Sequence, residues 1–180
     1  MAVKLHIKQI KAYKEVSVQV DGRTLMTKFG IKVYDADDLD SIRKEYSKLA
    51  TNDTLELALA KLTKLEETGD KSSEEFYQTR QEYRLTVEEE TQKQVAILND
   101  FYRSQVLFIT NAAVETEDGV SIKVDDTRTA KPVESLWESP EECLAVLLDT
   151  YFSVPSIRDS LSSSIVETVL NLQLDEKVKN

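Results

Sequence analysis

The chain has 180 residues, of which 41% are hydrophobic and 31% are charged, and it contains only 4 glycines and 3 prolines. This length fits one compact domain, and the scarcity of loop-forming residues predicts a fold built mostly from regular elements, chiefly helices. The net charge of -10 repels phosphate backbones and anionic membrane surfaces, which argues against nucleic acid and membranes as partners.

The sequence contains neither a membrane-spanning run of about 18 apolar residues nor a secretory signal pattern. We therefore expect the protein to stay in the cytoplasm of the cell that makes it. Cys143 is the only cysteine, so it has no partner for an intramolecular disulfide. Its neighbours 144–148 are apolar, which predicts a buried free thiol.

An antiparallel β-hairpin is predicted within residues 1–34. Apolar residues alternate along two stretches on either side of Asp21-Gly22, a dipeptide that tolerates the positive φ angles of a tight turn. A third strand could pair with this hairpin, because Val3, Leu5 and Ile7 also alternate. So small a sheet is marginal in water, and we expect it to pack against helices.

Residues 35–111 are predicted to be helical. Acidic residues at 35–38 favour the start of one helix, and a second begins near Asn52 and ends around Gly69. A capping box then opens a long helix from about Ser73 to Asn111, on the order of 55 Å if unbroken. The stretch Thr86–Gln94 is so polar that it marks either a solvated projection or a bend.

The last third of the chain predicts a short strand pair and two helices. The strand pair covers residues 112–126, where it could extend or cap the first sheet, and the helices cover residues 133–174. Ser139-Pro140 and Ser153 before Pro155 are typical helix starts. We thus predict one mainly helical α+β domain over residues 1–175, with a flexible tail at 176–180.

Residues able to support catalysis are few. His6 is the only histidine, and no second histidine or cysteine lies near it in the sequence to complete a metal site. Glycine is too rare for the usual phosphate-binding loops. The acids Glu138, Glu141 and Glu142 surround a helix start, where negative charge is expected. We predict no enzymatic activity, no catalytic residue, no cofactor and no metal.

Two sets of residues are candidates for binding a partner. Tyr83 and Val87 lie in the polar middle of the long helix, where they could contact a partner or pack within the chain. The last helix carries an apolar stripe that could form a groove for a helical client, or could simply complete the core. This stripe consists of Ile157, Leu161, Ile165 and Val169.

Four segments, taken with the order of the elements, have counterparts in a known family. They are the strand end 27–33, the acidic helix start 35–38, the turn 117–119 and the junction 151–157 between the last helices. This layout resembles the tail assembly chaperones of long-tailed bacteriophages. The resemblance implies a helical protein that coats the tape measure protein, keeps it soluble and recruits tail tube protein during tail assembly.

Other functions remain open at this point. The same layout could serve a structural component of a phage tail or capsid, a general protein-interaction scaffold, or a homo-oligomer. A metal-dependent nucleotide pyrophosphohydrolase would need acids repeated on two facing helices. The available acids Glu138, Glu141 and Glu142, with Glu66-Glu67, do not show that pattern.

Overall fold

The computed structural model of the chain describes residues 12–20, 23–69, 71–115 and 119–177. Its fold is α+β and mainly helical, with an antiparallel hairpin near the start and one long helix, as the sequence predicts. The chain divides into two compact units, one of Met1–Asp40 with Tyr102–Asn180 and one of Ser41–Phe101. A single folding domain over residues 1–175 stays a prediction.

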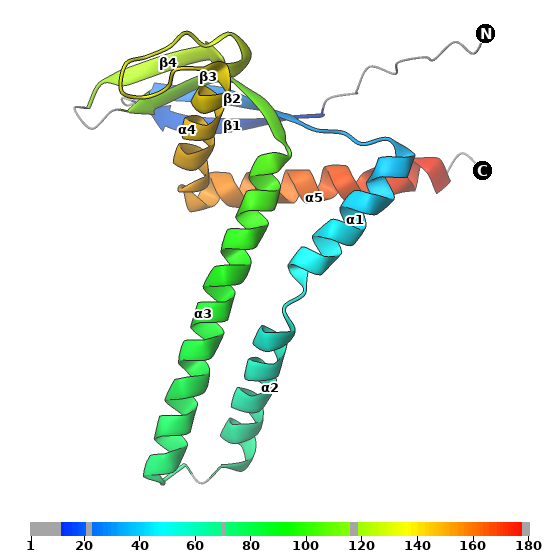
Figure 1. Cartoon of the computed structure of the whole chain (residues 1–180), viewed down its shortest axis with the longest axis vertical. Coiled ribbons are helices and arrows are strands. Elements are labelled where there is room, and N and C mark those ends of the chain that lie inside the picture. The colour runs from blue at the N-terminus through cyan, green and yellow to red at the C-terminus, as the bar shows by residue number, and fades with distance from the viewer. Residues whose placement is uncertain (1–11, 21–22, 70, 116–118, 178–180) are drawn as a thin grey trace. The chain divides into compact units, whose positions relative to one another are not determined.

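The first unit is built on an antiparallel sheet, which has the strand order β1-β2-β3-β4 within the described residues (Figure 1). A hairpin of β1 (Ala12–Val20) and β2 (Arg23–Ile31) is extended by β3 (Val106–Glu115) and β4 (Ser121–Asp126). The predicted second strand pair therefore extends the first sheet, and β1 and β4 are the outermost of its described strands. The possible third N-terminal strand and the Asp21-Gly22 turn lie outside the described residues.

Two buried hydroxyl groups complete the hydrogen bonding of β3. The hydroxyl oxygen of Tyr151 lies 3.1 Å from both the backbone nitrogen and the carbonyl oxygen of Ala113, so it accepts one hydrogen bond and donates another. Thr127 accepts a hydrogen bond from the Ile109 N–H at 3.0 Å. Asn111 lies between these points with a φ of 52°, a conformation that interrupts the regular strand. Buried backbone groups thus keep partners where the ladder is irregular.

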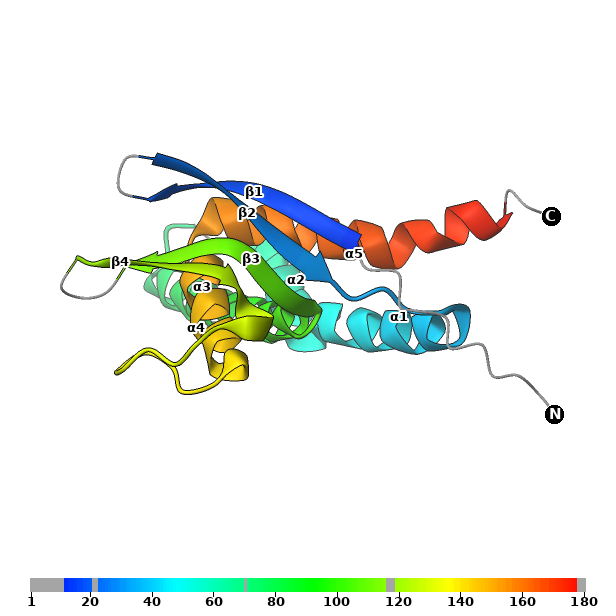
Figure 2. The same ribbon diagram turned by 90° about the horizontal axis from the view of Figure 1, so that it is seen from above.

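One face of the sheet is covered by α4 (Pro140–Phe152) and α5 (Pro155–Lys177), as Figures 1 and 2 show. The predicted cap of α4 is confirmed, because the side chain of Ser139 accepts a hydrogen bond from the Glu142 N–H at 3.2 Å. The core between these helices and the sheet contains large side chains that are almost fully buried. They include Phe29, Ile31, Ile109, Leu147, Tyr151, Leu161 and Ile165.

An aromatic side chain is also buried on the opposite face of the sheet. Phe108 lies across from Gly30 in the strand register and is only 2% exposed. A Cβ atom at Gly30 would overlap its ring, so glycine is needed for this close approach. Tyr13 packs edge-on against Phe108 at 6.0 Å, and the Arg128 guanidinium lies 3.8 Å from the ring centroid.

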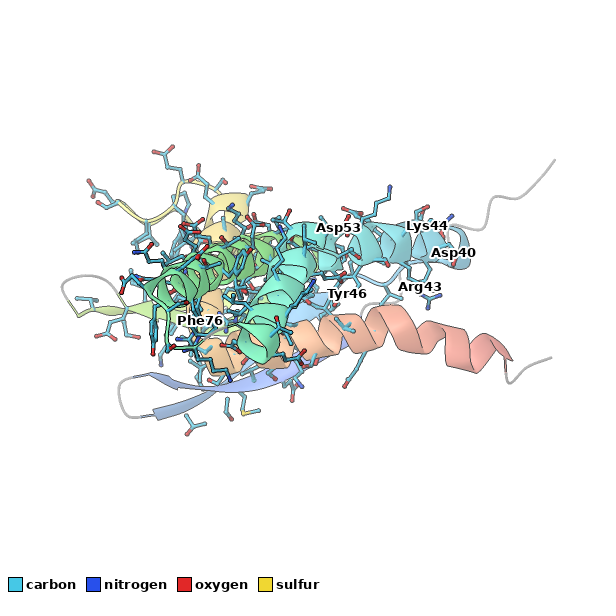
Figure 3. The ribbon with its side chains drawn as sticks, turned by 90° about the horizontal axis from the view of Figure 1, so that it is seen from below. Asp40, Arg43, Lys44, Tyr46, Asp53 and Phe76 are labelled. Atoms are coloured by element: carbon cyan, nitrogen blue, oxygen red, sulfur yellow. The ribbon has the colours of Figure 1, made fainter. Side chains whose placement is uncertain are left out.

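The second unit is helical. It contains the end of α1 (Ala36–Ala50), all of α2 (Asp53–Thr68) and most of α3 (Glu74–Ser104). A short connection joins α2 to α3, so these two helices run antiparallel side by side (Figure 1). Figure 3 shows Tyr46 on α1 and Phe76 at the start of α3. The ring of Tyr46 packs against that of Phe101 at 5.4 Å.

The predicted end of the long helix at Asn111 is wrong. The helix ends at Ser104, because the segment 106–110, in which four of five residues are β-branched or aromatic, pairs with β2 instead. Gln105 is held at this junction, where its carbonyl oxygen accepts a hydrogen bond from the Lys32 N–H at 2.9 Å. The 31 residues of α3 span about 46 Å. The helix is continuous through the polar stretch Thr86–Gln94.

Candidate partner-binding surface

Two of the acids that could have formed a catalytic site, Glu142 and Glu66, have local structural roles. The carboxylate of Glu142 accepts a hydrogen bond from the Glu138 N–H at 2.7 Å, beside the cap of α4. The carboxylate of Glu66 pairs with Arg80 at 3.0 Å. Within the described part of the chain, no three histidine, cysteine or acidic side chains are grouped closely enough to hold a metal ion. His6 lies outside the described residues.

Cys143 is a fully buried free thiol, as predicted. Burial raises the pKa of this thiol, because the interior disfavours the charged thiolate. The thiolate is the reactive form of cysteine, so Cys143 lacks the environment of a nucleophile.

The apolar stripe of α5 faces the interior of the first unit. Ile157 is 6% exposed, and Leu161 and Ile165 are 0% exposed. Their own chain covers them, so this face is not open to a client, and their burial favours the alternative in which they complete the core. The backbone of Val169 lies in α5, but its side chain lies outside the described residues.

Tyr83 and Val87 lie on the side of α3 that faces α2. Tyr83 lies three residues after Arg80 and Val87 lies three residues before Glu90, so all four share one face of α3. The side chains of Arg80 and Glu90 both contact the α2 segment. Arg80 pairs with Glu66, and Glu90 accepts a hydrogen bond from the Asn52 side chain at 3.3 Å. Tyr83 and Val87 are therefore placed between two points that fix α2 against α3. Both side chains are half-buried.

The core of the second unit is thin. Among its described residues, only Ala58, Phe76 and Phe101 are buried. The facing stripes of α2 and α3 instead form a half-buried row of apolar side chains, which we call the α2–α3 seam. It consists of Leu55, Leu62, Leu65, Tyr83 and Val87. Two antiparallel helices cannot cover such a row completely, so part of its apolar surface remains in contact with water.

Further apolar side chains of the second unit lie away from the seam, each more than 40% exposed. They are Leu57, Leu59, Tyr77, Leu85, Val95 and Ile97. They are scattered around both helices and do not form a continuous stripe, and isolated exposed apolar residues of this kind are common on proteins. The seam is the more ordered apolar feature, because its members repeat at helical spacing on two paired helices.

Sequence reasoning identified the α3 half of the seam but missed the α2 half. The signal was present, because Leu55, Leu62 and Leu65 follow the three- and four-residue spacing of one helix face. In the sequence alone that spacing predicts only an amphipathic helix, because a sequence does not say how completely a neighbouring helix covers the apolar stripe.

Comparison of the chain with protein-family models, with curated proteins and with solved structures finds no match. None of the described helices is long and apolar enough to cross a membrane.

Proposed function

We propose that this protein is a non-enzymatic assembly chaperone that binds a helical client along the α2–α3 seam. By the resemblance of its layout to phage tail assembly chaperones, the client would be a tape measure protein. The chaperone would keep that client soluble and would recruit tail tube protein during assembly.

The observation that carries this proposal is the half-buried seam. An amphipathic helix laid along the seam would cover the remaining surface of Leu62, Tyr83 and Val87, so that two helices become a three-helix bundle. Each fully buried apolar side chain contributes roughly 1.5–3 kcal/mol, so completing the burial of several of them offsets part of the cost of association. The 16 residues of α2 span about 24 Å, which suits a client helix of similar length.

The charge of the second unit favours a client helix with basic flanks. Residues 41–101 contain thirteen Asp and Glu residues against nine Lys and Arg residues, a net charge of -4. Opposite charges at the rim of an interface speed association and help to select the partner. The net charge of -10 on the whole chain would also keep many copies soluble along one long client.

Co-expression tests the proposal. The protein should be produced with the product of a neighbouring reading frame that encodes a very long helical protein. We expect that product to be soluble only when this chain is present, because its apolar helix faces need cover. If it is equally soluble alone, the chaperone function is contradicted.

A structural tail component could use the same seam as a permanent contact. Mass spectrometry of purified particles separates the two functions, because a chaperone acts before completion and should be absent from finished particles. Its presence at stoichiometric amounts would favour the structural function.

A further inference from the structure

A groove runs beside β4 in the first unit. The strand forms one wall with five consecutive residues, and the chain returns after β4 to form the other wall. The groove has a volume of about 300 Å³. Its lining is formed by residues 122–126, 129–131, Val133 and Trp137. Because β4 is an edge of the sheet, the described strands leave this side of it without a neighbour.

The hydrogen bonds of Ala113 determine which backbone groups of β4 point into this groove. Ala113 is paired with Lys123, but its N–H and C=O are bonded to the Tyr151 hydroxyl, on the side away from β4. Along two antiparallel strands, pairs of residues whose N–H and C=O groups bond each other alternate with pairs whose N–H and C=O groups point away from the partner strand. The N–H and C=O groups of Lys123 and Asp125 therefore point outward, away from β3, as unused donors and acceptors among the described residues.

The charged side chains of the groove are unevenly neutralised. Lys123 lies on the β4 wall and Lys131 on the returning wall, and neither forms an ion pair with another described residue. Asp126 is occupied, because it accepts hydrogen bonds from the Arg128 guanidinium at 2.9 and 3.1 Å. Asp125 is the remaining acid. With respect to the described side chains, the groove thus offers two unpaired ammonium groups against one unpaired carboxylate, on a protein whose net charge is -10.

We propose that this groove binds an extended segment of a partner polypeptide, which adds to β4 as a fifth strand. The outward N–H and C=O groups of Lys123 and Asp125 would supply the backbone hydrogen bonds, as in other cases where a peptide extends a sheet edge. An acidic side chain of the segment would lie between Lys123 and Lys131. This site is separate from the α2–α3 seam and does not depend on the proposed function.

Trp137 provides a direct measurement, because it lines the groove and is the only tryptophan of the chain. The probe is the peptide acetyl-Thr-Val-Thr-Glu-Thr-Val-Thr-amide, titrated into the full chain while tryptophan fluorescence is recorded. We expect a saturable change in emission. A peptide with Lys in place of the central Glu should bind roughly tenfold more weakly, because it reverses the sign of the cross-strand charge pairs.

Amide hydrogen exchange tests the backbone part of the proposal. In the free protein, the N–H groups of Ile122 and Val124 should exchange slowly, because they bond β3, and those of Lys123 and Asp125 should exchange fast. Saturation with the Glu peptide should slow exchange at Lys123 and Asp125. Exchange that stays fast at both positions in the presence of saturating peptide would overturn the proposal.

Two variants separate binding from folding. Lys123→Glu with Lys131→Glu should abolish the preference for the Glu peptide, while the matched change Lys48→Glu on α1 should leave it intact. Asp125→Pro removes one outward N–H, a change that edge strands tolerate, and should prevent binding with little loss of the folded circular dichroism signal. Unchanged binding by both groove variants would contradict the proposal.

The remaining alternative is that a second copy of the chain pairs with β4. Sedimentation of the protein without peptide distinguishes this case. We expect sedimentation to show no dimer that forms as the protein concentration rises. A dimer in which hydrogen exchange is also slow at the Lys123 and Asp125 amides would show that a second copy of the chain occupies the edge instead, and would overturn the proposal.

Discussion

The substitution Tyr151→Phe should destabilise the first unit without changing its packing. It keeps the ring, which packs edge-on against Phe29 at 5.5 Å, and removes only the hydroxyl. Ala113 is 4% exposed, so its N–H and C=O would both lose a partner in a site that water does not reach. Each unsatisfied buried group costs roughly 1–3 kcal/mol, so the two groups together should lower the free energy of unfolding by about 2–6 kcal/mol.

Urea denaturation followed by circular dichroism measures this loss, and the thermal midpoint should fall by roughly 10 °C. Tyr77→Phe is the matched control, because Tyr77 is 57% exposed and its substitution should change stability by less than about 0.5 kcal/mol. If Tyr151→Phe is as stable as the control variant, the hydroxyl does not support β3 and the reasoning is wrong.

Three further predictions concern the first unit. The double substitution Leu161→Asp with Ile165→Asp should unfold it, because both side chains are fully buried; circular dichroism would show the loss. Gly30→Val should cost at least about 2 kcal/mol in a denaturation experiment, since its side chain would overlap the Phe108 ring. Cys143 has a raised pKa in the folded state, so its contribution to stability is complete below the unfolded-state pKa of about 8.5 and is lost as pH rises above it. A pH series of denaturation midpoints checks this sign, and Cys143→Ala should flatten that part of the profile.

Local signals predicted most of the regular elements. Alternation revealed the first hairpin, and the Ser139-Pro140 pair fixed the start of α4. The end of α3 was missed because residues 106–109 carry apolar side chains that fit both a helix and a strand. The segment forms a strand and not a helix because Phe108 and Ile109 pair with β2, which lies far away in the sequence.

The candidate sites depend on tertiary contacts, which a pattern alone does not contain. The apolar stripe of α5 was visible, but its burial results from the first unit packing around Leu161 and Ile165. The groove beside β4 was not foreseen, because the returning segment 129–133 has no periodicity. Only the position of that segment beside the strand edge creates the site.

The most direct test of client binding compares two identical substitutions on α3. Val87→Asp places a charge in the seam, whereas Val95→Asp places the same charge at a position that is 41% exposed and lies off the seam. Each variant is co-expressed with the client, and the soluble client is quantified, with circular dichroism confirming that both variants remain helical. We predict that Val87→Asp leaves the client insoluble and that Val95→Asp keeps it soluble. Equal amounts of soluble client with both variants would contradict binding along the seam.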